Sequence, residues 1–161
     1  KKSFRGDLAV KGERIAEIGA LKGARAGEEI DAAGLTLAPG FIDVHTHDDR
    51  ALLIGDMGNK TSQGVTSVVV GNCGISLAPL TLRSAPPPPL DLIGAQADYR
   101  YATFADYMAA LDRQPPAVNA ACLVGHSTLR VGAMDRLDRP DQADHKGCRA
   151  HPVAAAEATR P

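Results

Sequence analysis

In the first 40 residues, short runs of apolar and polar positions alternate. Such a run lies on each side of segment 11–13, whose Lys-Gly-Glu sequence is typical of a turn. Alternation with a period of two around a glycine-containing turn indicates a β-hairpin, which we expect over 7–19. Further short β-like pieces are expected within 28–37. The pattern therefore predicts a small β layer over residues 1–40.

After residue 40, compact apolar runs alternate with segments of helical pattern. The runs 41–45, 65–70 and 117–124 predict three buried strands. A helix-compatible stretch, 51–63, separates the first two, and Thr103 has the character of a helix N-cap before the third. The apolar face of that second helix would consist of Phe104, Tyr107, Met108 and Leu111. Strands and helices in this order predict an α/β fold with a parallel sheet.

Two segments depart from this order. Segment 75–102 contains the proline run 86–89 and is interpreted as a loop, with the proline run as a surface linker. Segment 138–161 contains one large aliphatic residue, Val153, and is expected not to pack against a sheet. The expected units are thus 1–40, 41–137 and an aberrant tail.

The composition narrows the classes of function. The 161 residues include 18 Lys and Arg against 19 Asp and Glu, so the net charge is −1. A binder of nucleic acid or of an anionic membrane needs a basic surplus, and neither partner is expected. No stretch approaches the roughly 20 apolar residues of a membrane span, and no signal peptide is visible. Three widely spaced cysteines favour a reduced, cytoplasmic setting over a disulfide framework.

His45 and His47 carry the strongest chemical signal. Residues two apart in a strand point to the same side, so both imidazoles can bind one divalent metal. Cys73 follows the next expected strand, and neighbouring strands lie about 4.8 Å apart. From position alone, a zinc-binding thiolate and a buried structural cysteine are equally good interpretations of Cys73.

Other polar residues are weaker candidates. One of Asp43, Asp48 and Asp49 could orient an imidazole from behind, although solvated loop carboxylates are the favoured interpretation of the last two. Cys122 lies within an expected strand and is interpreted as structural. Cys148 and His145, in the tail, are interpreted as incidental. Turn positions are the favoured interpretation of the three residues after the third strand, His126, Ser127 and Arg130. The alternative is a role behind the metal ligands or on the substrate side.

The residues from Ala38 to His47, Ala-Pro-Gly-Phe-Ile-Asp-Val-His-Thr-His, resemble the first barrel strand of the amidohydrolase superfamily. Segment 6–34 is similar to the small N-terminal β-sandwich of that superfamily. Two further blocks, 63–79 and 124–130, resemble the D-aminoacylase (N-acyl-D-amino-acid deacylase) family. The resemblance implies the first three or so strands of an incomplete metal-dependent (β/α)₈ (TIM) barrel, a fold that takes roughly 250 residues when complete.

The resemblance also implies an activity. Members of this family hydrolyse the amide bond of N-acyl-D-amino acids with Zn²⁺, releasing a carboxylate and a D-amino acid. His45, His47 and Cys73 match the family's metal ligands, and the cysteine replaces the carboxylated lysine of dihydroorotase and hydantoinase relatives. The catalytic aspartate and two further histidines would lie beyond residue 161. The isolated chain is therefore expected to be inactive without a missing C-terminal part of the enzyme. The alternatives are a non-catalytic remnant of a truncated or frameshifted gene and a dihydroorotase- or hydantoinase-like enzyme.

Overall fold

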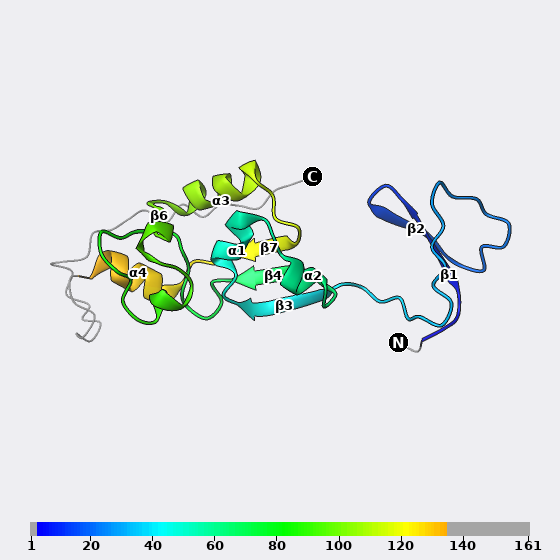
Figure 1. Ribbon diagram of the computed structural model, residues 1–161, viewed down its shortest axis with the longest axis horizontal. Helices are drawn as coiled ribbons and strands as arrows, with labels where there is room; N and C mark the ends of the chain where they lie inside the picture. Colours follow the sequence, from blue (N-terminus) through cyan, green and yellow to red (C-terminus); the bar gives the residue numbers. More distant parts are fainter. Residues whose placement is uncertain (1–2, 135–161) are drawn as a thin grey trace. The chain divides into compact units, whose positions relative to one another are not determined.

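The computed structural model describes residues 3–134 (Figure 1). These residues belong to two compact units, one ending at Ala38 and one beginning at Pro39. The expectation that segment 138–161 does not pack falls outside the described residues. Within the described part of the chain, no helix is long and apolar enough to cross a membrane.

The first unit contains the predicted hairpin. Strands β1 (Asp7–Lys11) and β2 (Arg14–Gly19) pair in antiparallel fashion, and Gly12 in the turn has a φ of +61°, which favours glycine. The β-like pieces expected within 28–37 were wrong, because no strand occurs there. Their large apolar residues, such as Ile30 at 82% exposure, are not covered by any part of the chain that the structure describes. Alternating hydrophobicity without a neighbouring backbone does not make a strand.

The second unit is built on a parallel sheet, which confirms the predicted α/β class. Strands β3 (Phe41–Thr46), β4 (Val65–Val70) and β7 (Asn119–Cys122) lie in the order β3-β4-β7 (Figure 1). Both pairings are parallel. The carboxyl ends of all three strands therefore meet at one edge of the sheet.

The predicted burial of the first of these strands was wrong. In β4, Val68 and Val70 are fully buried, whereas Phe41, Ile42 and Val44 of β3 are each about 60% exposed. The physical reason is packing: among the described residues, β4 is the only element in extensive contact with β3, so the apolar side chains of β3 stay exposed. The apolar run at 41–45 indicated the strand correctly but could not show which side chains are covered.

The helices follow the predicted order with one change. In place of one helix over 51–63, the chain forms α1 (Asp49–Ile54) and α2 (Gly58–Thr61), because Gly55 ends α1 with a φ of +82°. Helix α3 (Phe104–Arg113) begins at the predicted cap, where the Thr103 hydroxyl accepts a hydrogen bond from the Asp106 amide. Its predicted apolar face is confirmed, since Tyr107 and Leu111 are buried while Phe104 and Met108 are partly buried.

Segment 75–102, expected to be a loop, contributes to the core, whereas the proline run 86–89 within it is exposed or partly exposed. It contains the antiparallel strands β5 (Leu80–Thr81) and β6 (Arg100–Tyr101) and the 3₁₀ helices η1 (Leu90–Leu92) and η2 (Gln96–Asp98). Its buried apolar side chains are those of Ile75, Leu77, Ala78, Leu80, Leu90, Ile93, Tyr99 and Tyr101. These residues follow no single period along the segment, so periodicity could not reveal that they pack together. In Figure 1 the segment lies beyond the carboxyl ends of the sheet strands, with helix α4 (His126–Ala133).

Candidate metal centre

The three residues singled out from the sequence as metal ligands are neighbours in the structure. His45 lies in β3, His47 follows the end of β3, and Cys73 lies in the turn after β4. Their nearest nitrogen and sulfur ligand atoms all lie within 4.8 Å of one another. The two imidazole centroids are 5.9 Å apart, with a tilt of 54° between the rings. The geometry therefore fulfils the same-side condition that a shared metal requires.

A tight turn carries Cys73 to the histidines. The Gly74 amide donates a hydrogen bond of 3.0 Å to the Gly71 carbonyl, and Gly71 has a φ of +82°. A Cβ at position 71 would lie 2.1 Å from the Leu123 carbonyl oxygen, so only glycine fits there. The Asn72 side chain donates a hydrogen bond of 2.9 Å to the Val44 carbonyl. The turn is thereby bound to β3, the strand at whose end the histidine pair lies.

The donor set fits a metal of intermediate softness. Two imidazole nitrogens and one thiolate sulfur are ligands that Zn²⁺ accepts in a tetrahedral arrangement. His45, His47 and Cys73 are exposed in this chain, so an ion can reach them. A structural zinc site is closed by four protein ligands, whereas a catalytic one keeps a position for water. Three exposed donors match the open type of centre.

A lysine that the sequence analysis did not single out lies beside this group. The Lys60 ammonium in α2 is 2.7 Å from the Asp43 carboxylate, 3.0 Å from that of Asp48, and 3.0 Å from the Thr46 hydroxyl. The hydrogen bond from Lys60 is the main cause that lowers the pKa of Asp43. Burial acts to lower the pKa of Lys60, but its bonds to Asp43 and Asp48 outweigh this and raise it. The interpretation of Asp48 as a solvated carboxylate was wrong, because its side chain is 15% exposed and paired.

Asp49, the first residue of α1, was also wrongly interpreted as solvated. It is 1% exposed, and its Oδ1 accepts a hydrogen bond of 3.3 Å from the Leu77 amide. Its Oδ2 has no hydrogen-bond partner among the described residues. Burial raises the pKa of this carboxyl to about 6. Because Tyr107 also donates a hydrogen bond to its carbonyl, Asp49 connects α1 with α3 and with segment 75–102.

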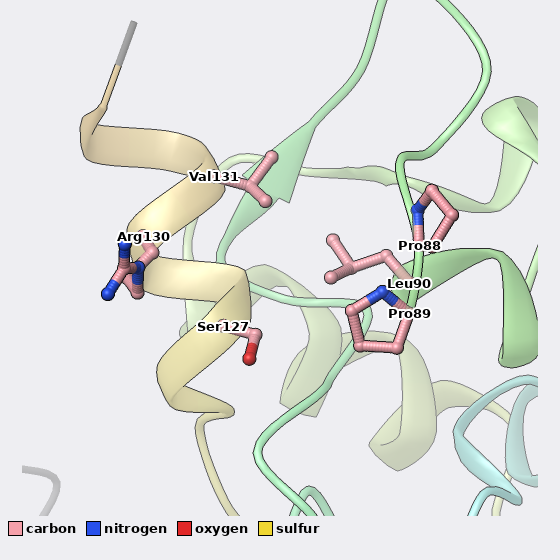
Figure 2. A pocket seen from close by; sticks show the side chains of 6 residues that line it. All are labelled: Pro88, Pro89, Leu90, Ser127, Arg130 and Val131. Atoms are coloured by element: carbon pink, nitrogen blue, oxygen red, sulfur yellow. The ribbon is translucent and has the colours of Figure 1, made fainter. Parts of the chain in front are cut away.

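His126, Ser127 and Arg130 lie in α4, so their interpretation as turn residues was wrong. The Ser127 amide donates a hydrogen bond of 2.8 Å to the Gly74 carbonyl, which places the start of α4 next to Cys73. A cavity of about 180 Å³ lies between α4 and the proline run. It is lined by Pro88, Pro89, Leu90, Ser127, Arg130 and Val131 (Figure 2). Figure 2 shows Arg130 extending away from the prolines, and both polar and apolar residues line the cavity.

Cys122, the last residue of β7, is separate from the metal group. Its side chain is half-buried and packs against the hydrophobic core, and burial raises the pKa of its thiol to about 12. A neutral thiol is a poor metal ligand, because the thiolate is the species that binds. The structure therefore agrees with the interpretation of Cys122 as structural.

Comparisons with known proteins identify the family of this chain. A family profile described as "Amidohydrolase family" matches residues 28–157. A D-aminoacylase from Alcaligenes xylosoxydans xylosoxydans is 59% identical over 136 residues, which cover 84% of this chain and 28% of the relative. A solved D-aminoacylase structure, reported with a binuclear metal centre, superposes with a TM-score of 0.81 at 56% identity, covering 86% of this chain and 29% of that one.

A second solved structure adds an ion and an inhibitor. It is an N-acyl-D-glutamate deacylase from Bordetella bronchiseptica, complexed with zinc and with a phosphonate that mimics the tetrahedral intermediate. It superposes with a TM-score of 0.77 at 46% identity and covers 86% of this chain and 29% of that one. This chain spans under a third of the length of the relatives it matches. With the profile match extending over most of its residues, the chain belongs to the amidohydrolase family.

Proposed function

We propose that this chain supplies part of the zinc centre of a hydrolase that cleaves the amide bond of N-acyl-D-amino acids. The products would be a carboxylate and a free D-amino acid. The observation that carries the proposal is the grouping of His45, His47 and Cys73 within 4.8 Å at the carboxyl edge of a parallel sheet. The relatives named as D-aminoacylase and N-acyl-D-glutamate deacylase favour this substrate class over that of dihydroorotase or hydantoinase.

The chain's own residues would divide the work between two elements. The imidazoles at the end of β3 and the thiolate of the Cys73 turn would hold the ion, which would supply an activated water and polarise the acyl carbonyl. His126, Ser127 and Arg130 are proposed on the substrate side, because α4 begins next to Cys73. A guanidinium there is suited to the carboxylate of an amino acid.

The 161 residues alone are expected to be inactive. General acid–base transfer is typically worth 10²–10⁴-fold, and the family resemblance places the aspartate implied for it outside this chain. A productive zinc site also needs a dry, shaped cavity, whereas His45, His47 and Cys73 are exposed to solvent. The partner that would complete the site is the remaining C-terminal part of such an enzyme.

Metal binding tests the proposed centre directly. The purified chain, stripped with a chelator and then dialysed against Zn²⁺, is expected to bind zinc weakly and to retain much less than one ion per chain. His47→Asn and Cys73→Ser should each abolish this binding, whereas His126→Asn, a matched change of an exposed histidine outside the group, should leave it intact. Binding that survives both ligand substitutions would refute the proposed centre.

Activity tests the second half of the proposal. The chain alone, supplied with zinc, should not release D-amino acid from any N-acyl-D-amino acid. Turnover that disappears with His47→Asn would show that the 161 residues are sufficient and would contradict the expected inactivity.

A further inference from the structure

A single ammonium group contacts the side chains of residues that lie before, between and after the two histidines in the sequence. Lys60 lies in α2, and its contacts reach back 17 residues to Asp43 and 14 residues to Thr46. It also pairs with Asp48 at 3.0 Å. Asp43 precedes His45 by two residues and Asp48 follows His47 by one. The residues that Lys60 contacts therefore lie on both sides of the histidine pair in the sequence.

The groups around Lys60 form a closed network. The second oxygen of Asp43 accepts a hydrogen bond of 3.2 Å from the His45 amide, and the Thr46 hydroxyl donates one to Asp48. The side chains of Lys60, Asp43 and Asp48 are 18%, 30% and 15% exposed. Partly buried ion pairs are screened less by salt than pairs in open water. We call these four side chains, Asp43, Thr46, Asp48 and Lys60, the Lys60 clasp.

The clasp spans a defect in the sheet. The pairing of β3 with β4 is regular at neither end, and its register shifts between Asp43 and Thr46, the interval that contains His45. On its other side, β3 has no strand partner among the described residues. The strand pairing thus constrains the backbone at His45 poorly, and the Lys60 clasp restrains the residues on both sides of this interval.

We propose that Lys60 is a positioning residue for the metal centre, holding the end of β3 so that His45 and His47 stay on the same side. The inference rests on the proposed metal centre. Groups that orient metal ligands from behind are typically worth 10–100-fold in metal affinity. Lys60 acts here through the backbone of β3, because its contacts are to Asp43, Thr46 and Asp48 and not to an imidazole.

The direction in which metal affinity changes when Lys60 is replaced distinguishes an electrostatic role from a positioning role. Removing the Lys60 ammonium leaves the carboxylates of Asp43 and Asp48 without their counter-charge, so the surroundings become more negative. Attraction between charges alone would then strengthen the binding of a divalent cation. Loss of positioning weakens it. The two roles of Lys60 therefore predict opposite changes in metal affinity.

The experiment uses the full 161-residue chain with Co²⁺ as the probe, because cobalt–thiolate absorption reports ligation by Cys73. Lys60→Met, which keeps much of the aliphatic stem, is expected to weaken Co²⁺ binding about tenfold or more. Lys60→Arg, which keeps the charge and can bridge two carboxylates, should restore much of the affinity. Arg50→Met is the matched control: it removes a cation paired with Asp98 at 3.3 Å outside the clasp, and should change nothing.

Folding is checked in each variant by the near-ultraviolet circular dichroism of the core tyrosines. Should Lys60→Met lose that signal, Thr46→Val serves instead, since it keeps the shape of the side chain and deletes one contact of the clasp; an affinity loss of several-fold is then expected. Unchanged or tighter Co²⁺ binding in folded Lys60→Met, or in Thr46→Val where that variant is used, would overturn the positioning role and leave the metal centre standing. Failure of the unaltered chain to bind Co²⁺, or binding insensitive to His47→Asn, would overturn the centre and the positioning role with it.

Discussion

Strands β3 and β4 are neighbours in one sheet and have the same length, yet their environments differ. Val68 and Val70 of β4 are fully buried, whereas Ile42 and Val44 of β3 are 64% and 59% exposed. Both strands are rich in β-branched residues, so local preference forms both of them. The difference shows that strand formation and burial have separate causes. A strand forms where suitable residues meet a neighbouring backbone, as β3 meets β4, whereas burial depends on what packs on each face.

The polar residues show the same contrast. His45, His47 and Cys73, which suit metal binding, lie at exposed positions, whereas the carboxyl of Asp49 is buried and the thiol of Cys122 is half-buried. The hydrophobic core that covers these last two groups includes residues of segment 75–102 and α3.

The largest expected difference between the exposed and the covered positions is in the reactivity of their cysteine thiols. With Cys148→Ser as background, Cys73 should be alkylated quickly at pH 8, and Cys122 slowly. A pKa of about 12 leaves Cys122 roughly 1,000-fold less thiolate than a cysteine of ordinary pKa, and burial adds a barrier to access. Mass spectrometry of the alkylated peptides against time measures both rates.

The pH dependence sharpens this prediction. Because the folded state keeps the Cys122 thiol neutral, the stability that it contributes is present below pH 9 and is lost as the pH rises toward 12. The labelling rate of Cys122 should rise about tenfold per pH unit over that range. Equal labelling rates of both cysteines at pH 8 would contradict the contrast between the exposed and the covered positions.

Truncation of valines should show an intermediate difference. Val68→Ala removes buried methyl groups and leaves a cavity, so a loss of about 2 kcal/mol in the free energy of unfolding is expected. Val44→Ala, the matched change in the exposed strand, should cost under about 1 kcal/mol. Urea unfolding can be followed by tyrosine circular dichroism, because Tyr99, Tyr101 and Tyr107 all lie in the second unit. Equal losses would mean that β3 is covered in solution.

The smallest effect concerns the link between the two strands. Asn72→Ala removes the hydrogen bond to the Val44 carbonyl and should cost about 1 kcal/mol or less. Amide hydrogen exchange should accelerate in β3 while β7 is unaffected. Asn119→Ala is the control, since the Asn119 side chain makes the corresponding bond of 3.2 Å to Thr66 between β7 and β4. Faster exchange throughout the sheet in Asn72→Ala would contradict a local role.

Much of the fold was predictable because it depends on local spacing. The hairpin, the order of the three parallel strands and the cap of α3 follow from period-two patterns, β-branched runs and the Thr103–Asp106 pair. The candidate metal group was predictable for a related reason. Residues two apart in a strand share a side, and parallel strands bring their carboxyl ends together.

Other features had no local signal. Segment 75–102 has no regular period, so its contribution to the core was missed. Nothing near Lys60 in the sequence marks it as the partner of Asp43 and Asp48, because those contacts span up to 17 residues. In the sequence, Asp49 cannot be told from a solvated loop carboxylate, because its hydrogen bonds with Leu77 and Tyr107 join distant segments.

Local sequence was enough to predict the hairpin, the three parallel strands and the start of α3, and to place two histidines and a cysteine at the ends of neighbouring strands. The exposure of β3, the burial of Asp49 and the contacts of Lys60 around the histidine pair became apparent only from the folded structure. The physical reason is the distance along the chain over which each kind of interaction acts. Backbone preference and side-chain periodicity act over a few residues, whereas burial and ion pairing depend on which distant segments arrive at the same place.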